Sequence, residues 1–187
     1  VAVTAPFTGV VADMLGRRRV IAVAMALLVI PDLMMAFSPG LEALLFWRFM
    51  QGLLLPPIFA VSIAYIGGEM PADEATGMTG IYTAGCAIGG FSGRFLTGIL
   101  AEPIGWRGAF VVDAALTALF AIGVIVLLPH EKKFVRADNL KVSLKQMLKH
   151  LRNPQLMATF AVGFGVLFNL IEVFTLVSFH IAAPPFN

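Results

Sequence analysis

Residues 9–19, Gly-Val-Val-Ala-Asp-Met-Leu-Gly-Arg-Arg-Arg, run from the end of one apolar segment into a short polar stretch, residues 13–19, that precedes the next apolar segment. Cations are costly in the hydrocarbon of a bilayer, so the three arginines are expected at a membrane surface. The following segment, residues 20–37, approaches the roughly 20 apolar residues that cross a bilayer as a helix. The stretch therefore predicts a loop that joins two spanning helices, with Asp13 ending one helix and Gly16 permitting a sharp turn.

The rest of the chain repeats this alternation of apolar segments and short polar turns. Of the 187 residues, 59% are hydrophobic and 13% are charged, about half of the usual quarter for soluble domains. So few charges cannot cover a soluble protein of this size, which indicates lipid as the solvent. The sequence predicts an all-α membrane protein, a polytopic transmembrane helix bundle with one partial and five full spans. The predicted spans are residues 1–12, 20–37, 42–66, 76–101, 108–128 and 156–181.

The chain opens at Val1 inside an apolar segment, so we expect an internal fragment or a truncated product of a longer protein. Cys86 is the only cysteine, which excludes an intrachain disulfide and a thiolate metal cluster. No metal-ligand spacing or pair of nucleophile and base is apparent. We therefore predict no catalytic residue, no cofactor and no metal.

Lysine and arginine orient the predicted spans, because they concentrate in cytoplasmic loops. The loops at residues 13–19, 67–75 and 129–155 lie on one side, since even numbers of spans separate them. These loops carry ten lysines and arginines, and the opposite side carries only Arg107. The basic loops are therefore predicted to be cytoplasmic. Membrane topology explains the basic residues, so no nucleic-acid partner is predicted.

The loop at residues 129–155 contains one predicted element. Ser143 and Gln146 have the spacing of a capping box. The apolar residues that follow share one helical face, namely Leu144, Met147, Leu148 and Leu151. We expect a short amphipathic helix that either lies on the anionic leaflet or docks on the protein itself.

The arrangement of Gly9, Asp13 and Gly16 before Arg17 and Arg18 is the most specific pattern in the chain. A generic basic hairpin would explain the arginines but not the two glycines and the aspartate together. The pattern resembles the loop signature between the second and third helices of the major facilitator superfamily, with Met14 where a basic residue is usual. The resemblance implies that these residues form a conformational latch, with Gly9 permitting close helix approach, and that the chain covers helices two to seven of a twelve-helix transporter.

Arg48, Gln51 and Gly52 resemble a fourth-helix motif of the proton-coupled exporters in the same superfamily, with Leu54 where a glycine is common. An arginine inside a span costs roughly 2.5 kcal/mol or more, so it usually faces the interior of the bundle. The alternative is that Arg48 snorkels to the outer surface, which is about 9 Å away along the helix.

Gly85, Gly89 and Gly93 repeat every four residues and predict a ridge for tight helix packing. With Gly90, they resemble the fifth-helix motif of drug/proton antiporters, although Cys86 stands where that motif has proline. Such ridges are also common in packed membrane helices of any function.

Four charged residues are predicted at one depth, roughly 8–10 Å below the outer face at helical rise. They are Asp32, Arg48, Arg94 and Asp113. Burial favours pairing between such opposite charges, although each could also snorkel separately.

Glu172 lies nearer the middle of its span than any other ionisable residue, and Asn169 shares its helical face. The resemblance places helices four and seven on the wall of a cavity. We therefore expect Arg48, Asn169 and Glu172 to line the pathway of substrate and protons. The alternative for Glu172 is a neutral structural glutamate.

Together these features predict most of an N-terminal six-helix half over residues 1–128. The loop at 129–155 then leads to the first helix of a C-terminal half at 156–187. The expected function is proton-coupled efflux of a small molecule by alternating access, in the bacterial inner membrane. The expected partners are the lipid bilayer, a small-molecule substrate, protons and the remaining helices. The alternatives are a non-transporting receptor or scaffold and an intramembrane enzyme.

Overall fold

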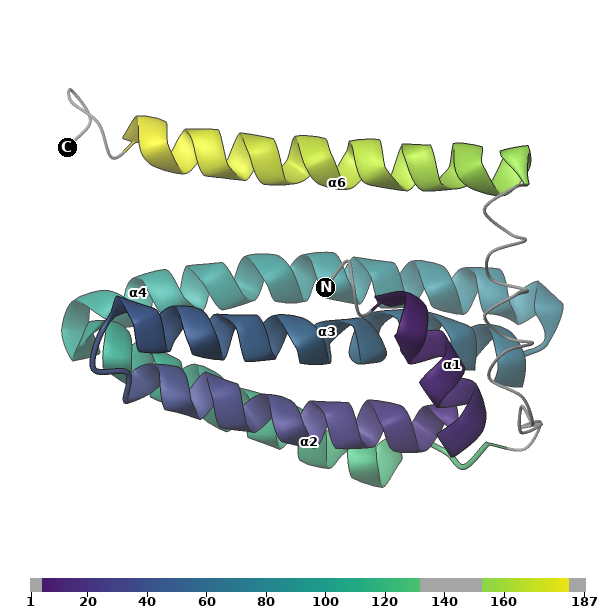
Figure 1. Ribbon diagram of the computed structural model, residues 1–187, viewed down its shortest axis with the longest axis horizontal. Coiled ribbons are helices and arrows are strands. Elements are labelled where there is room, and N and C mark those ends of the chain that lie inside the picture. The colour runs from purple at the N-terminus through teal and green to yellow at the C-terminus, as the bar shows by residue number, and fades with distance from the viewer. Residues whose placement is uncertain (1–4, 132–152, 182–187) are drawn as a thin grey trace. The chain divides into compact units, whose positions relative to one another are not determined.

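The computed structural model describes residues 5–131 and 153–181, and every regular element in this part of the chain is an α-helix. The helices are α1 (Ala5–Leu15), α2 (Arg17–Ala36), α3 (Leu41–Glu69), α4 (Ala72–Leu127) and α6 (Pro154–Ile181). Helices α1 to α4 form one unit, and α6 belongs to a second (Figure 1). The prediction of an all-α fold is confirmed.

Helix α4 contains two spans that run in opposite directions. Its 56 residues would extend about 84 Å in a straight helix, far beyond the ~30 Å core of a bilayer. Gly105, with φ 72° and ψ 165°, breaks the helical backbone, and glycine adopts this positive φ without the usual steric cost. The chain reverses there, as Figure 1 shows. We call residues 72–104 the first arm of α4 and residues 106–127 its second arm.

The helix ends of this unit gather in two groups. At one end, Arg107 donates a 3.2 Å hydrogen bond to the carbonyl oxygen of Ser38, which joins the reversal in α4 to the turn between α2 and α3. At the other end, Arg18 donates a 2.7 Å hydrogen bond to the carbonyl oxygen of Leu128. The start of α2 and the end of α4 therefore meet, as the parity of the predicted spans requires.

Three predicted boundaries differ from the structure. Arg17, predicted in a loop, is the first residue of α2. Only Met70 and Pro71 separate α3 from α4, where a longer acidic loop was predicted. Pro154, predicted within the loop at residues 129–155, begins α6, where proline is favoured. A charged residue marks the membrane surface, but the backbone hydrogen bonds of a helix continue past it. The amphipathic helix predicted within residues 143–151 lies outside the described residues.

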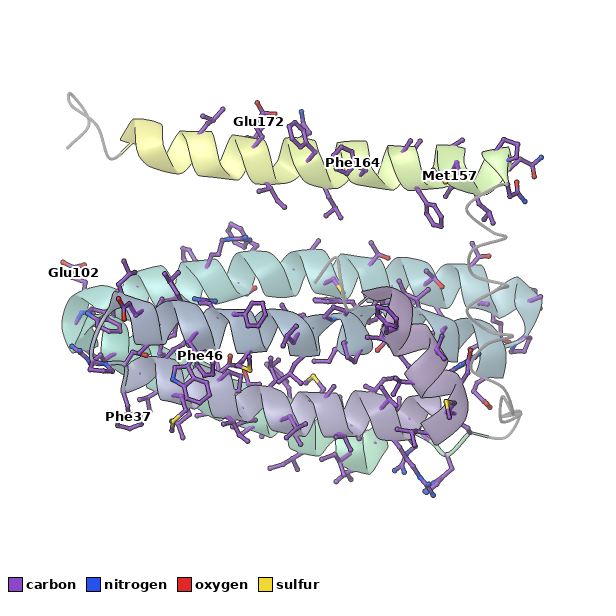
Figure 2. All side chains as sticks on the ribbon, viewed as in Figure 1. Phe37, Phe46, Glu102, Met157, Phe164 and Glu172 are labelled. Atoms are coloured by element: carbon purple, nitrogen blue, oxygen red, sulfur yellow. The ribbon has the colours of Figure 1, made fainter. Side chains whose placement is uncertain are left out.

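Many large apolar side chains of these helices are exposed. Phe37 and Phe46 project from α2–α3 with 67% and 54% of their surface accessible (Figure 2). Ala12, Ile21 and Val61 pack instead into a small buried cluster. It lies toward the end of the unit where α2 begins, which we call the Arg17 end. By length and composition, α2, α3, α4 and residues Pro154–Val173 of α6 can cross a membrane. Lipid or further helices suit such apolar surfaces better than water does.

Candidate functional site

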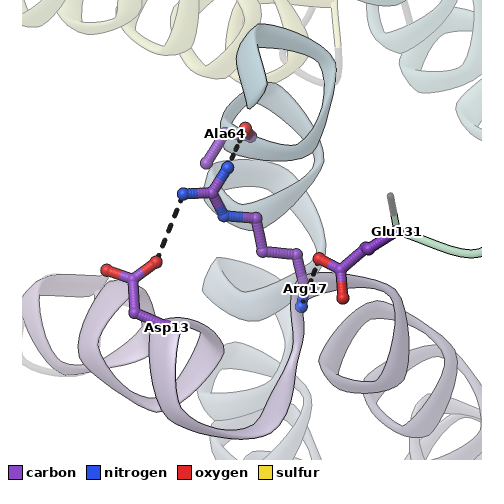
Figure 3. A network of polar contacts seen from close by, with 4 residues as sticks. All are labelled: Asp13, Arg17, Ala64 and Glu131. Atoms are coloured by element: carbon purple, nitrogen blue, oxygen red, sulfur yellow. Dashed lines mark hydrogen bonds and ion pairs between the residues drawn. The ribbon is translucent and has the colours of Figure 1, made fainter. Parts of the chain in front are cut away.

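The guanidinium of Arg17 joins the first three helices. Its Nη2 lies 3.3 Å from Oδ1 of Asp13 in α1, and its Nη1 donates a 2.7 Å hydrogen bond to the carbonyl oxygen of Ala64 in α3 (Figure 3). Both partners of the ion pair are partly exposed, so the pair contributes about 0–1 kcal/mol by itself. The structure thus brings together Asp13 and Arg17, two of the residues predicted to form a latch.

Glu131, which follows the end of α4 in the sequence, also contacts Arg17. Its Oε1 accepts a 2.8 Å hydrogen bond from the backbone amide of Arg17, across 114 positions of sequence (Figure 3). The first amides of a helix lack intrahelical partners, and a carboxylate is favoured there by the helix dipole. Glu131 therefore caps α2. Glu131 was not predicted from the sequence, because no local pattern links it to Arg17.

Arg18 caps the end of α4 in return. Its guanidinium donates hydrogen bonds to the carbonyl oxygens of Leu128, at 2.7 Å, and Ile125, at 3.0 Å. Such terminal carbonyls have no partner within their own helix, and basic side chains commonly satisfy them. The start of α2 and the end of α4 therefore cap each other. We call Asp13, Arg17, Arg18 and Glu131 the latch cluster.

Of the two glycines predicted in the latch, Gly16 occupies a position that requires glycine. Gly16 has φ 95°, and a Cβ atom there would lie 2.9 Å from Oε2 of Glu131. A residue with a side chain would therefore meet both backbone strain and a steric clash. A Cβ atom at Gly9 would have no described atom within 4 Å. The close helix approach predicted at Gly9 is not made among the described helices and stays a prediction.

A second polar cluster joins α2, α3 and the second arm of α4. Asp32 is only 2% exposed. Its Oδ1 accepts a 2.8 Å hydrogen bond from Nε2 of Gln51, and its Oδ2 accepts one of 2.9 Å from Thr117. Oε1 of Gln51 accepts a 2.9 Å hydrogen bond from Nη1 of Arg48. We call these four residues the Asp32–Arg48 network.

Charges on both sides fix the orientation of the Gln51 side chain. Its carbonyl oxygen faces the guanidinium of Arg48, and its amino group faces the carboxylate of Asp32. A flipped amide would place donors against donors and acceptors against acceptors. The amide dipole therefore points favourably at both ions, and hydrogen bonds to ions are the stronger kind.

The guanidinium of Arg48 is held against the protein. It lies over the ring of Phe110 in the second arm, 5.4 Å from the ring centroid. Its bond to Gln51 and its contact with Phe110 tie the guanidinium to two helices of the unit. Of the four charges predicted at one depth, Asp32 and Arg48 are joined through Gln51, and Asp113 interacts electrostatically with both. Arg94, on the first arm, donates to the carbonyl oxygen of Gly90.

The glycine ridge lies on the first arm of α4. Cβ atoms at Gly85, Gly89 and Gly93 would have no described atom within 4 Å, and a Cβ at Gly90 would meet only the side chain of Arg94. Tight packing of the ridge against another helix therefore stays a prediction.

Glu172 and Asn169 lie on α6, which is described by itself. Both side chains are exposed on this helix, and Figure 2 shows Glu172 projecting from it. The rings of Phe164 and Phe168 stack on the same helix with centroids 5.8 Å apart. The role of Asn169 and Glu172 in a pathway for substrate and protons stays a prediction.

Apolar spanning helices that hold ionisable groups between them define an integral, multi-pass membrane protein. Residues 1–184 match the family model of the Major Facilitator Superfamily. The chain therefore belongs to the Major Facilitator Superfamily, as the resemblance implied.

Two relatives named as transporters match along nearly the whole chain, and a relative named as a multidrug resistance protein matches over part of it. An uncharacterised transporter of Buchnera aphidicola subsp. Schizaphis graminum is 30% identical over 181 residues, covering 96% of this chain and 44% of its own length. The inner membrane transport protein YnfM of Escherichia coli is 26% identical over 185 residues, covering 97% and 44%. The multidrug resistance protein Stp of Mycobacterium tuberculosis is 32% identical over 109 residues, covering 58% and 20%.

The chain thus spans less than half the length of the relatives that it matches most fully. No solved structure matches it.

Proposed function

We propose that the complete protein is a secondary transporter of the bacterial inner membrane that exports a small molecule by alternating access, coupled to protons. Three observations support the proposal. The chain belongs to a transporter family, a relative is named as an inner membrane transport protein, and other relatives are named as multidrug resistance proteins.

The observation that carries the proposal is the Asp32–Arg48 network. Ionisable groups are rare inside membrane spans, and there they commonly mark pathways for substrates and ions. Arg48 is exposed on the surface of the described unit, yet its guanidinium is held by Gln51 and Phe110. A charged group on such a surface needs protein or water beside it rather than lipid. This supports a position for Arg48 on the wall of a polar pathway in the complete transporter.

Glu172 and Asn169 complete the proposed pathway from the C-terminal half. Desolvation within a membrane favours the uncharged form of a carboxyl group, and contact with water or a cation favours the charged form. A carboxyl group exposed alternately to the two sides therefore takes up a proton on one side and releases it on the other. That exchange supplies the driving force for export against a gradient.

The latch cluster is suited to an end that must open and close. Each of its polar contacts is weak by itself, with the partly exposed ion pair of Asp13 and Arg17 contributing about 0–1 kcal/mol. Several weak contacts together stabilise one access state, yet they break within the few kcal/mol that separate such states. We propose that the latch cluster holds the cytoplasmic ends of α1, α2, α3 and α4 together in one of the two states.

The test is flux through the complete protein in proteoliposomes. Ethidium, a sugar and an organic anion serve as probes of different chemistry, and each is offered with and without a pH gradient. Gradient-dependent accumulation of one of them supports proton-coupled transport. Binding without flux in any condition would favour the receptor or scaffold, and chemical conversion of a probe would favour the enzyme.

A further inference from the structure

Asp113 lies on the same face of the second arm of α4 as Phe110, which contacts the Asp32–Arg48 network, and Thr117, which belongs to it. Phe110 precedes it by three positions and Thr117 follows it by four, so the three side chains lie above one another. Phe110 contacts Arg48, and Thr117 donates a hydrogen bond to Asp32. Asp113 is therefore placed between the two ends of the Asp32–Arg48 network.

The charges of this cluster do not cancel. Asp32 from α2 and Arg48 from α3 are the charged groups that interact with Asp113 in the described part of the chain. Two carboxylates and one guanidinium leave one net negative charge when all three are ionised. An uncompensated charge is costly in a region of low dielectric, and a single bound proton removes it.

The two carboxyl groups differ in their hydrogen bonds. Asp32 accepts one bond from Gln51 and another from Thr117, so both of its oxygens are stabilised in the ionised form. Gln51 in turn accepts a bond from Arg48, which strengthens the bond that Gln51 donates. Among the described residues, no hydrogen-bond donor reaches the half-buried Asp113. Protonation at Asp113 therefore breaks no hydrogen bond, whereas protonation at Asp32 opposes two.

We propose that Asp113 is a proton-binding site of the N-terminal half, and that the Asp32–Arg48 network holds the compensating ion pair beside it. A carboxylate oxygen of Asp113 gains a proton from water, and the cluster becomes neutral. When the proton returns to water, the cluster regains its net negative charge. Proton binding itself does not depend on the proposed function, whereas a role of Asp113 in coupling rests on it.

The test is infrared spectroscopy of the complete purified transporter across a range of pH. A protonated carboxyl group in an apolar site has a distinct carbonyl stretch, which disappears on ionisation. We expect a band that titrates with pH in the wild type and is lost in Asp113→Asn. Asp113→Glu, which keeps a carboxyl group, retains a titrating band at a changed frequency and shows that the substituted protein is folded.

Two further variants make the assignment specific. Asp32→Asn removes the second negative charge, so the Asp113 band should titrate at lower pH. Glu102→Gln, at an exposed carboxyl group near the reversal in α4, should leave the band unchanged. A titrating band that persists unaltered in Asp113→Asn overturns the inference. A band that is lost only in Glu172→Gln also overturns it, and leaves the proposed function standing.

Discussion

The side-chain amide of Gln51 donates a 2.8 Å hydrogen bond to the carboxylate of Asp32, while its oxygen accepts one of 2.9 Å from Arg48. A neutral side chain thereby connects two opposite charges of different helices within the apolar part of the unit. In the described residues the link runs through Gln51 and not through a direct ion pair. Gln51 therefore lets the buried Asp32 and the exposed Arg48 stabilise each other without direct contact.

Replacing Gln51 by leucine should destabilise the protein. The substitution keeps a similar side-chain volume but leaves the buried Asp32 with the bond from Thr117 alone. The loss of a partner by a buried polar group costs about 1–3 kcal/mol, or more for a charged one. Thermal unfolding of the detergent-solubilised protein should show a lower midpoint for Gln51→Leu. The matched control is Gln155→Leu, at an exposed position of α6, and equal midpoints for the two variants would show that the bridge contributes nothing.

The sequence predicted the membrane class and the grouping of the helix ends, because apolar length and the parity of spans determine both. It also placed Asp32, Arg48 and Asp113 at one depth, because depth follows from helical rise. The partners of these charges were not predicted. Gln51 and Thr117 reach Asp32 across 19 and 85 positions of sequence, and no local periodicity encodes such contacts. Glu131 was missed for the same reason, since its bond to Arg17 depends on how α4 returns to the start of α2.

Alanine at position 16 should destabilise the latch end. Gly16 has φ 95°, and a Cβ atom there would approach Glu131 to 2.9 Å. This positive-φ conformation alone costs roughly 1–3 kcal/mol for a residue with a side chain. Gly77→Ala, on the first arm of α4, is the matched control, because nothing described lies within 4 Å of a Cβ at that position. We expect a lower unfolding midpoint for Gly16→Ala only. Equal midpoints would mean that the turn relaxes without cost.

Asp13→Asn should slow the change of access state more than it weakens substrate binding. The substitution removes the charge that faces Arg17, and a loss of about 1 kcal/mol changes the balance of two states roughly five-fold. Rates of exchange and affinity should be measured on the same reconstituted protein. An unchanged exchange rate, or a loss confined to affinity, would argue against a role as a latch.

The Arg17 end of the unit should face the cytoplasm. In a Cys86→Ala background, a cysteine at Glu102 should react with an impermeant maleimide added to intact cells. A cysteine at Asp73, which is exposed near the start of α4, should react only after the membrane is made permeable. The reverse pattern would invert the predicted topology.

We expect the complete protein to couple transport to protons through a carboxyl group of the pathway. The most direct measurement compares wild type and Glu172→Gln in proteoliposomes, with whichever of ethidium, the sugar or the organic anion the wild type transports. Accumulation driven by a pH gradient is recorded beside gradient-free exchange of labelled for unlabelled substrate. We expect Glu172→Gln to lose accumulation and to keep exchange, because glutamine cannot carry a proton between the two sides. Normal accumulation driven by the pH gradient in Glu172→Gln would contradict it.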